Sequence, residues 1–368
     1  MLEHGGRLRR AAREHGIPLA DWLDLSTGVN PHAYPAPPVP ATAWQRLPED
    51  DDGLEDAAAR YYGSAALLPV AGSQPAIQAL PAALVPAWAA GRPPHPPGTP
   101  RGAAAPPRVA LLAPSYAEHA HAWRGCAPAL VGAEDIAAAV DRSDIVVLVQ
   151  PNNPTGALFE RARLLDWHAR LARRGGWLVV DEAFIDTVPE ASLAPAAGVD
   201  GLVVLRSLGK FFGLAGARVG FVLAPAHLRR VLADMLGPWT LSGPARLVAR
   251  QALADHAWQA RTRSRLRAEG ERLQALLAAT GFAPAHGPAL FKWVPIPHAA
   301  ALHAHLARRG ILSRLFDTPP AVRFGLPPDE HGWQRLEAAL QTCGEALHRS
   351  GSAPAGSPPS PRIPTHGC

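Results

Sequence analysis

Short apolar, β-branched runs alternate along the chain with segments of helical periodicity. One helical segment, residues 160–174, places apolar side chains on roughly one face of an Arg-rich stretch and predicts an amphipathic helix. Because strands alternate with helices, we expect a mainly parallel sheet covered on both faces, with ligands at the carboxyl ends of its strands. The runs that predict buried strands are residues 108–113, 144–150, 176–180, 202–206 and 219–223.

Beyond Pro244 the pattern changes to long helical segments at 245–279 and 297–309, a strand-like run at 322–326 and a last helix to about His348. The change predicts a second, smaller α/β domain. Segments rich in Pro, Gly, Ser and Ala predict a flexible insertion and a disordered tail. The expected organisation is an N-terminal arm 1–35, a large domain 36–240 with the insertion at 91–107, a small domain 241–350 and the tail 351–368.

Composition narrows the class of protein. With 368 residues, 48% of them hydrophobic, the chain can bury a large core, which excludes disorder throughout. The apolar run 79–90 is interrupted by prolines and too short for a membrane span, and the start lacks the pattern of a signal peptide, so we expect a cytoplasmic protein. The 3 cysteines lack metal-ligand spacing, so we expect neither disulfides nor a bound metal. Arginines are dispersed along a chain of net charge +5, which favours small anionic substrates over nucleic acid.

The chain contains only two lysines, Lys210 and Lys292. Lys210 follows the predicted strand 202–206 in a Gly-containing turn, where apolar neighbours would lower its pKa and make the amine a nucleophile for Schiff-base chemistry. Ser207 and Arg218 lie close enough in sequence to donate to one phosphate. A surface lysine in a glycine turn is the alternative interpretation.

Two further polar segments follow predicted strands. The segment QPNNPTG occupies 150–156, and Asp181 ends the apolar run WLVV. A buried carboxylate needs a cationic partner, and a protonated pyridine nitrogen is one. Taken singly, the first segment is also typical of an ordinary turn and Asp181 of a helix N-cap.

In this order, the motifs PNNPTG, DEAF and SLGKFFGLAGARVGF resemble fold-type I pyridoxal-phosphate enzymes of the aminotransferase class I/II group, in the histidinol-phosphate aminotransferase-like branch. The resemblance covers almost the whole chain. It implies an α/β fold of the PLP-dependent transferase type, a homodimer and pyridoxal 5'-phosphate as cofactor. It also implies that Lys210 forms a Schiff base with the cofactor, Asp181 pairs with the pyridine nitrogen, Asn153 bonds the ring 3-oxygen, and Ser207 and Arg218 hold the phosphate.

Other segments resemble the same family. Ser73 and Gln74 open a predicted helix whose free amides suit the cofactor phosphate, with Ser73 as a possible N-cap. Tyr116 matches the ring that stacks on the pyridine, although it could simply pack in the core. Arg323 matches the arginine for a substrate carboxylate, and Arg314 either meets a second anion or is solvated.

Two positions depart from the family. Phe184 stands where many relatives carry a tyrosine whose hydroxyl supports the ring 3-oxygen, so that contact is expected to be missing or replaced. Leu47 stands where relatives often place a tyrosine that reaches the partner subunit's cofactor phosphate. The cross-subunit contact is therefore in doubt, although the dimer is not.

The N-terminal HGG and the segment 21–31 are similar to threonine-phosphate decarboxylases of cobalamin biosynthesis, a branch of the family. The similarity implies decarboxylation of a small phosphorylated amino acid, O-phospho-L-threonine, to (R)-1-amino-2-propanol phosphate. Gly28 and Asn30 would line the substrate site and His4 would approach the substrate phosphate, although an ordinary turn and a surface histidine explain these residues equally well. The alternatives are an aminotransferase acting on a substrate such as histidinol phosphate and a non-catalytic binding protein of the same fold.

Overall fold

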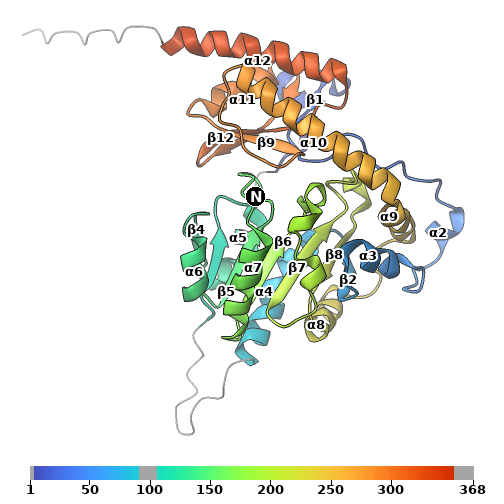
Figure 1. Cartoon of the computed structure of the whole chain (residues 1–368). Coiled ribbons are helices and arrows are strands. Elements are labelled where there is room, and N and C mark those ends of the chain that lie inside the picture. The colour runs from blue at the N-terminus through green and yellow to red at the C-terminus, as the bar shows by residue number, and fades with distance from the viewer. Residues whose placement is uncertain (1–3, 91–105, 352–368) are drawn as a thin grey trace, which may run out of the picture.

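The computed structural model describes residues 4–90 and 106–351 and forms two lobes (Figure 1). The expected insertion lies outside the described residues over 91–105, as does the expected tail over 352–368. The predicted domain boundaries stay predictions. Within the described parts of the chain, no helix has the length and apolar character to cross a membrane.

The lower lobe is built on a sheet that has seven strands in the described residues, in the order β2-β8-β7-β6-β5-β3-β4. Strands β3 to β7 pair in parallel, whereas β8 is antiparallel to both of its neighbours. The prediction of a mainly parallel α/β sheet is confirmed. The strands are β2 (Leu67–Val70), β3 (Val109–Leu112), β4 (Ala129–Val131), β5 (Ile145–Val149), β6 (Trp177–Asp181), β7 (Leu202–Ser207) and β8 (Gly220–Leu223).

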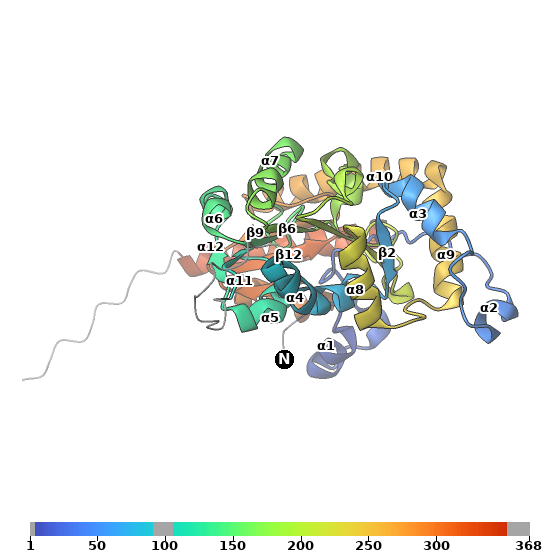
Figure 2. The same ribbon diagram turned by 90° about the horizontal axis from the view of Figure 1, so that it is seen from below.

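Helices cover both faces of this sheet (Figure 2). One face packs against α4 (Ser73–Ala90), α5 (Ala117–Trp123) and α8 (Ala226–Leu236), and the other against α6 (Ile136–Arg142) and α7 (Arg161–Ala172). Every residue of β5 and β6 is buried, which explains why these strands are continuous apolar runs without alternation. The apolar face predicted for residues 160–174 is the face that α7 buries, through Leu164, Trp167 and Leu171.

The upper lobe contains a sheet that has three strands in residues 106–351, in the order β11-β12-β9 and antiparallel throughout. The helical pattern at 245–279 forms two helices rather than one, because the Asp255 carboxylate accepts a hydrogen bond from Trp258 N at 2.9 Å and caps a new helix. Helix α9 (Gly243–Ala254) lies at the side of the lower lobe and leads into α10 (His256–Ala279), which reaches the upper lobe (Figure 1). The other elements of the upper lobe are β9 (Phe291–Pro295), α11 (Ala299–Ala307), β11 (Arg314–Asp317), β12 (Pro320–Gly325) and α12 (Glu330–Gly351).

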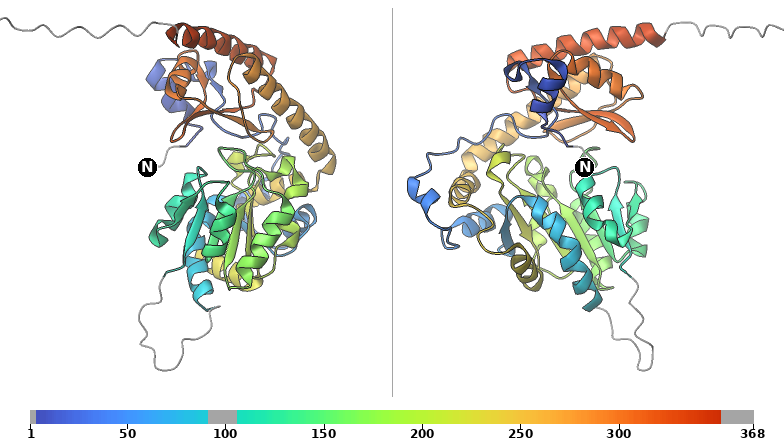
Figure 3. Two further views of the ribbon diagram at one scale, coloured as in Figure 1. Left: turned by 60° about the vertical axis from the view of Figure 1, so that its left-hand side comes forward. Right: turned by 180° about the vertical axis from the view of Figure 1, so that it is seen from behind.

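The N-terminal segment lies in the upper lobe, beside elements that come from the other end of the chain (Figure 3). Strand β1 (Leu23–Asp24) pairs in parallel with β10 (Ile311–Leu312). Helix α1 (Leu8–His15) precedes strand β1, and helices α2 (Ala41–Gln45) and α3 (Leu54–Tyr62) follow it. Of these helices, α3 packs against α9. Single 3-10 turns lie at Leu19–Asp21, Arg124–Cys126, Ile185–Thr187, Pro189–Ala191, Ala194–Ala196 and Ala215–Ala217.

Candidate active site

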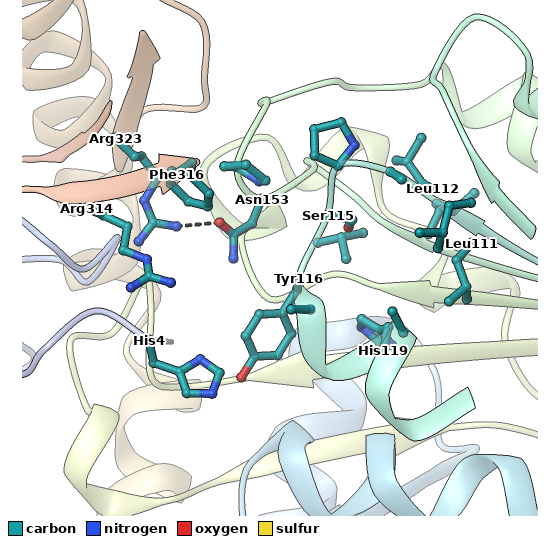
Figure 4. A pocket seen from close by; sticks show the side chains of 18 of the residues that line it. His4, Leu111, Leu112, Ser115, Tyr116, His119, Asn153, Arg314, Phe316 and Arg323 are labelled. Carbon is teal, nitrogen blue, oxygen red and sulfur yellow. Dashed lines mark hydrogen bonds between the residues drawn. The ribbon is translucent and has the colours of Figure 1, made fainter. Parts of the chain in front are cut away.

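The carboxyl ends of the parallel strands face the upper lobe and meet a cavity of about 780 Å³. Tyr116 follows β3, Asn153 follows β5 and Lys210 follows β7, and all of them line this cavity. Arg314 and Arg323 reach it from the upper lobe, and His4 reaches it from the N-terminal segment (Figure 4). The structure therefore gathers side chains that lie up to 319 residues apart in sequence, from His4 to Arg323.

The turn after β7 holds Lys210 at the cavity wall. Its carbonyl accepts hydrogen bonds from Asn30 N at 3.0 Å and Gly213 N at 3.1 Å. Its ammonium lies 5.4 Å from the centre of the Phe184 ring. Burial, together with the positive charge of Arg323, lowers the pKa of Lys210 to about 8. Much more of this amine is unprotonated near neutral pH than of an ordinary lysine, as a nucleophile requires.

Asp181, at the end of β6, is 2% exposed and pairs with a histidine. Its Oδ2 lies 3.0 Å from Nε2 of His119, and its Oδ1 accepts from Ala183 N at 3.1 Å. His119 Nδ1 is buried and has no hydrogen-bond partner among the described residues. Sequence reasoning missed His119, since a single histidine on a helix gives no signal unless the position of Asp181 is known.

The N-terminus of α4 faces Ser207 and Arg218. A Cβ on Gly220, which pairs with Ser207, would lie only 2.9 Å from Ser73 N, and one on Gly72 would lie 2.7 Å from an Arg218 guanidinium nitrogen. Ser73 is the first residue of α4, so it is not the residue that precedes and caps the helix. The first-turn amides, the Ser207 hydroxyl and the Arg218 guanidinium together form a group of donors suited to an anion.

Tyr116 stands at the start of α5. Its hydroxyl donates to Gln74 Oε1 at 3.0 Å. Burial, reinforced by the nearby charge of Asp181, raises the pKa of Tyr116 to about 12, so the phenol is neutral at pH 7 and acts as a donor.

Arg323 and Arg314 occupy directly paired positions on β12 and β11. Arg323 is 6% exposed; its guanidinium donates to the side-chain oxygen of Asn153 (Figure 4) and to the carbonyl of Ser26 at 2.9 Å. Burial and the charge of Arg314 lower the pKa of Arg323 to about 10. Two neighbouring cations therefore meet at one end of the cavity, which favours a ligand of at least two negative charges.

Gly28 and Asn30 lie behind the side chains of the site, where they contact Phe184 and the turn of Lys210. A Cβ on Gly28 would lie 2.8 Å from the ring of Phe184. Asn30 donates its side-chain amide to the carbonyl of Phe211 at 2.8 Å, which braces the turn of Lys210. Their predicted contact with substrate stays a prediction. Phe184 is buried behind Lys210, with its ring centre 5.4 Å from the Lys210 ammonium, and Leu47 is exposed on the surface.

Comparisons with known proteins show the family of this chain. The model of the aminotransferase class I and II family matches residues 46–340. A threonine-phosphate decarboxylase of Pseudomonas aeruginosa is 53% identical over 95% of this chain and 100% of that protein, and one of a Sinorhizobium species is 40% identical over 92% and 97%. The crystal structure of histidinol-phosphate aminotransferase from Sinorhizobium meliloti in complex with pyridoxal-5'-phosphate superposes with a TM-score of 0.75 at 20% identity, covering 94% of this chain and 96% of that one.

Proposed function

This chain belongs to the aminotransferase class I and II family, and on that premise we propose that it is a pyridoxal-phosphate-dependent enzyme of cobalamin biosynthesis. It converts O-phospho-L-threonine to (R)-1-amino-2-propanol phosphate and carbon dioxide. The threonine-phosphate decarboxylases to which it is similar match nearly its whole length, which supports this reaction.

The residues present fit the cofactor. The donors at the start of α4, Ser207 and Arg218 would hold its phosphate, and Gly220, which has no Cβ, lets the start of α4 pack close to β8 beside them. Asp181 would meet the pyridine nitrogen, and Tyr116 would stack on the ring. Lys210, whose pKa is lowered to about 8, would bind the aldehyde carbon. When bound, pyridoxal phosphate holds the substrate amine and accepts the electron pair left when a bond at Cα breaks.

Side chains of the protein orient the substrate, and this orientation determines which bond at Cα breaks. Arg323 binds the substrate carboxylate and Arg314 the substrate phosphate, so the substrate is fixed at both ends before the reaction. The Asp181 carboxylate, held by His119, stabilises positive charge beside it. After carbon dioxide leaves, the Lys210 ammonium returns one proton to Cα, which replaces the carboxylate with hydrogen and balances the reaction.

The observation that carries this proposal is the pairing of Arg314 with Arg323 across β11 and β12. Phosphothreonine presents a carboxylate and a phosphate on one small molecule. Histidinol phosphate, the substrate of the rival aminotransferase, carries a phosphate but no carboxylate. The two cations at one end of the cavity therefore match both anionic groups of phosphothreonine, whereas histidinol phosphate would engage only one of them.

A paired assay tests the proposal. Purified protein with pyridoxal phosphate is mixed first with phosphothreonine, and carbon dioxide is measured; it is then mixed with histidinol phosphate and 2-oxoglutarate, and glutamate is measured. We expect carbon dioxide release that disappears in Lys210→Ala and persists in Lys292→Ala, which removes the other lysine. Glutamate formation without carbon dioxide would instead identify an aminotransferase, and neither product would favour a binding protein.

We also propose a homodimer in the cytoplasm. Trp44, Leu47 and Trp239 expose 69%, 63% and 59% of their surfaces, which is unusual for such large apolar side chains. Trp239 lines a surface pocket with Pro48, next to Leu47, so these residues lie on neighbouring parts of the lower lobe. A second copy of the chain is the partner that would cover them.

A further inference from the structure

Residues 4–6, here called the N-terminal strap, lie along the cavity on the side of Arg323. Gly6 N donates to the Ser26 hydroxyl oxygen at 2.7 Å, and Ser26 O accepts from Arg323 at 2.9 Å. A Cβ on Gly5 would lie 2.3 Å from that same Ser26 carbonyl oxygen, so only glycine permits this approach. The HGG motif thus fastens the strap beside one of the proposed substrate-binding arginines.

The strap also contacts the lower lobe, through Glu118. His4 Nε2 lies 2.7 Å from Glu118 Oε1, in the first turn of α5. The other carboxylate oxygen accepts from Gln74 Nε2 at 2.8 Å and Gln78 Nε2 at 3.0 Å, both on α4. Both oxygens of Glu118 are therefore engaged, and the side chain is only 13% exposed.

The Glu118 carboxylate fixes the direction of the Gln74 amide. An amide group donates from one side and accepts on the other, so a Gln74 that gives its NH2 to Glu118 must turn its oxygen the opposite way. That oxygen accepts from the Tyr116 hydroxyl at 3.0 Å. The tyrosine is a neutral donor at pH 7, so the three side chains form a chain of hydrogen bonds with one direction.

We propose that Glu118 is a positioning residue, which orients the Tyr116 ring through Gln74 and latches the N-terminal strap to the lower lobe through His4. The inference rests on the proposed function, since Tyr116 is the side chain expected to stack on the cofactor. Without Glu118, the Gln74 amide can turn over, so that its NH2 group instead of its oxygen faces the Tyr116 hydroxyl. The hydroxyl then has no acceptor for its proton. The ring then loses its fixed orientation, and the strap loses its contact with α5.

Cofactor binding tests the positioning role. Apoprotein is titrated with pyridoxal phosphate, and the dissociation constant is measured by absorbance for wild type and for the variants. Glu118→Ala should weaken binding roughly threefold to tenfold, the effect of one hydrogen bond. Glu118→Asp, which keeps the charge but is too short to reach, should do the same, whereas Glu118→Gln, which keeps an acceptor for Gln74, should stay near wild type. His121→Ala, at an exposed position of the same helix, is the matched control.

A double-mutant cycle with Tyr116→Phe separates positioning from a general structural effect. If Glu118 acts through the Tyr116 hydroxyl, Glu118→Ala should cause no further loss in the Tyr116→Phe background. Additive losses would overturn the positioning role. The proposed function would still stand in that case, provided that the wild-type protein binds pyridoxal phosphate. A wild-type protein that binds no pyridoxal phosphate would refute the proposed function and the positioning role together.

Hydrogen–deuterium exchange in the holoenzyme tests the latch directly. His4→Ala and Glu118→Ala should each speed exchange of the Gly6 amide, and the double variant should exchange no faster than either single one. His121→Ala should leave it unchanged. Equal exchange in wild type and both single variants would refute the latch, whatever the cofactor titration shows.

Discussion

Replacing Lys210 by methionine should stabilise the cofactor-free protein near neutral pH, although it removes the proposed catalytic amine. The reason is that the folded protein must hold a charged amine where burial disfavours it. The folded pKa of about 8 lies below the ordinary value of 10.5. Between these values the unfolded chain binds more protons than the folded one, so the stability of the wild-type protein should rise with pH across this window.

The magnitude follows from the distance between the two pKa values. At about 1.4 kcal/mol per pH unit, burial of the Lys210 amine destabilises the fold by about 3.3 kcal/mol at pH 7, and by about 0.8 kcal/mol at pH 10. The free energy of unfolding of Lys210→Met should therefore exceed that of the wild-type protein at pH 7. About 2.5 kcal/mol of this difference should disappear by pH 10. Any change in packing due to the methionine is independent of pH and drops out of this comparison.

Urea unfolding of both apoproteins at several pH values between 7 and 10 measures this difference. Lys292→Met is the matched control: burial also lowers the pKa of Lys292, but less, so its pH-dependent term should be smaller. A difference between Lys210→Met and wild type that stays constant over this range would show that Lys210 titrates as an ordinary lysine. The account of a desolvated nucleophile would then be wrong.

Three further predictions follow from the site and the surface. Arg314→Gln should lower kcat/KM for phosphothreonine roughly tenfold to a hundredfold in steady-state assays, because a charge-assisted contact is lost; an effect no larger than that of the exposed Arg308→Gln would exclude the phosphate role. Gly220→Ala should raise the dissociation constant for pyridoxal phosphate, since its Cβ would lie 2.9 Å from Ser73 N; unchanged affinity would place the phosphate elsewhere. Trp239→Glu should shift a dimer toward monomer in light scattering, and an unaltered mass would remove Trp239 from the interface.

The parallel strands of the large sheet could be predicted because burial on both faces makes them continuous apolar runs. Strand β2 was missed because it contains Pro69, and the edge strand β4 because Ala129 and Leu130 are exposed. Strand β9 was missed because Lys292 interrupts its apolar pattern. In each case the local sequence lacks the signal, and only pairing with a distant strand explains the element.

The predicted side chains Tyr116, Asn153 and Lys210 share the cavity because strand direction alone brings them to one edge of the sheet. Asn30 could not be placed in the same way, since its hydrogen bonds go to a turn 180 residues later, around Lys210 and Phe211. Glu118 could not be found either, because its partner His4 lies 114 residues earlier in the chain. The sequence therefore predicts the side chains that lie at the strand ends, whereas contacts between the lobes can be identified only from the structure.

Borohydride reduction of the purified protein with pyridoxal phosphate, followed by peptide mass mapping, tests the central claim most directly. The chain has two lysines, so the outcome is unambiguous. We expect one pyridoxyl group per chain, attached to Lys210, with Lys292 unmodified. A label on Lys292 alone, or no label on either lysine, would contradict the account.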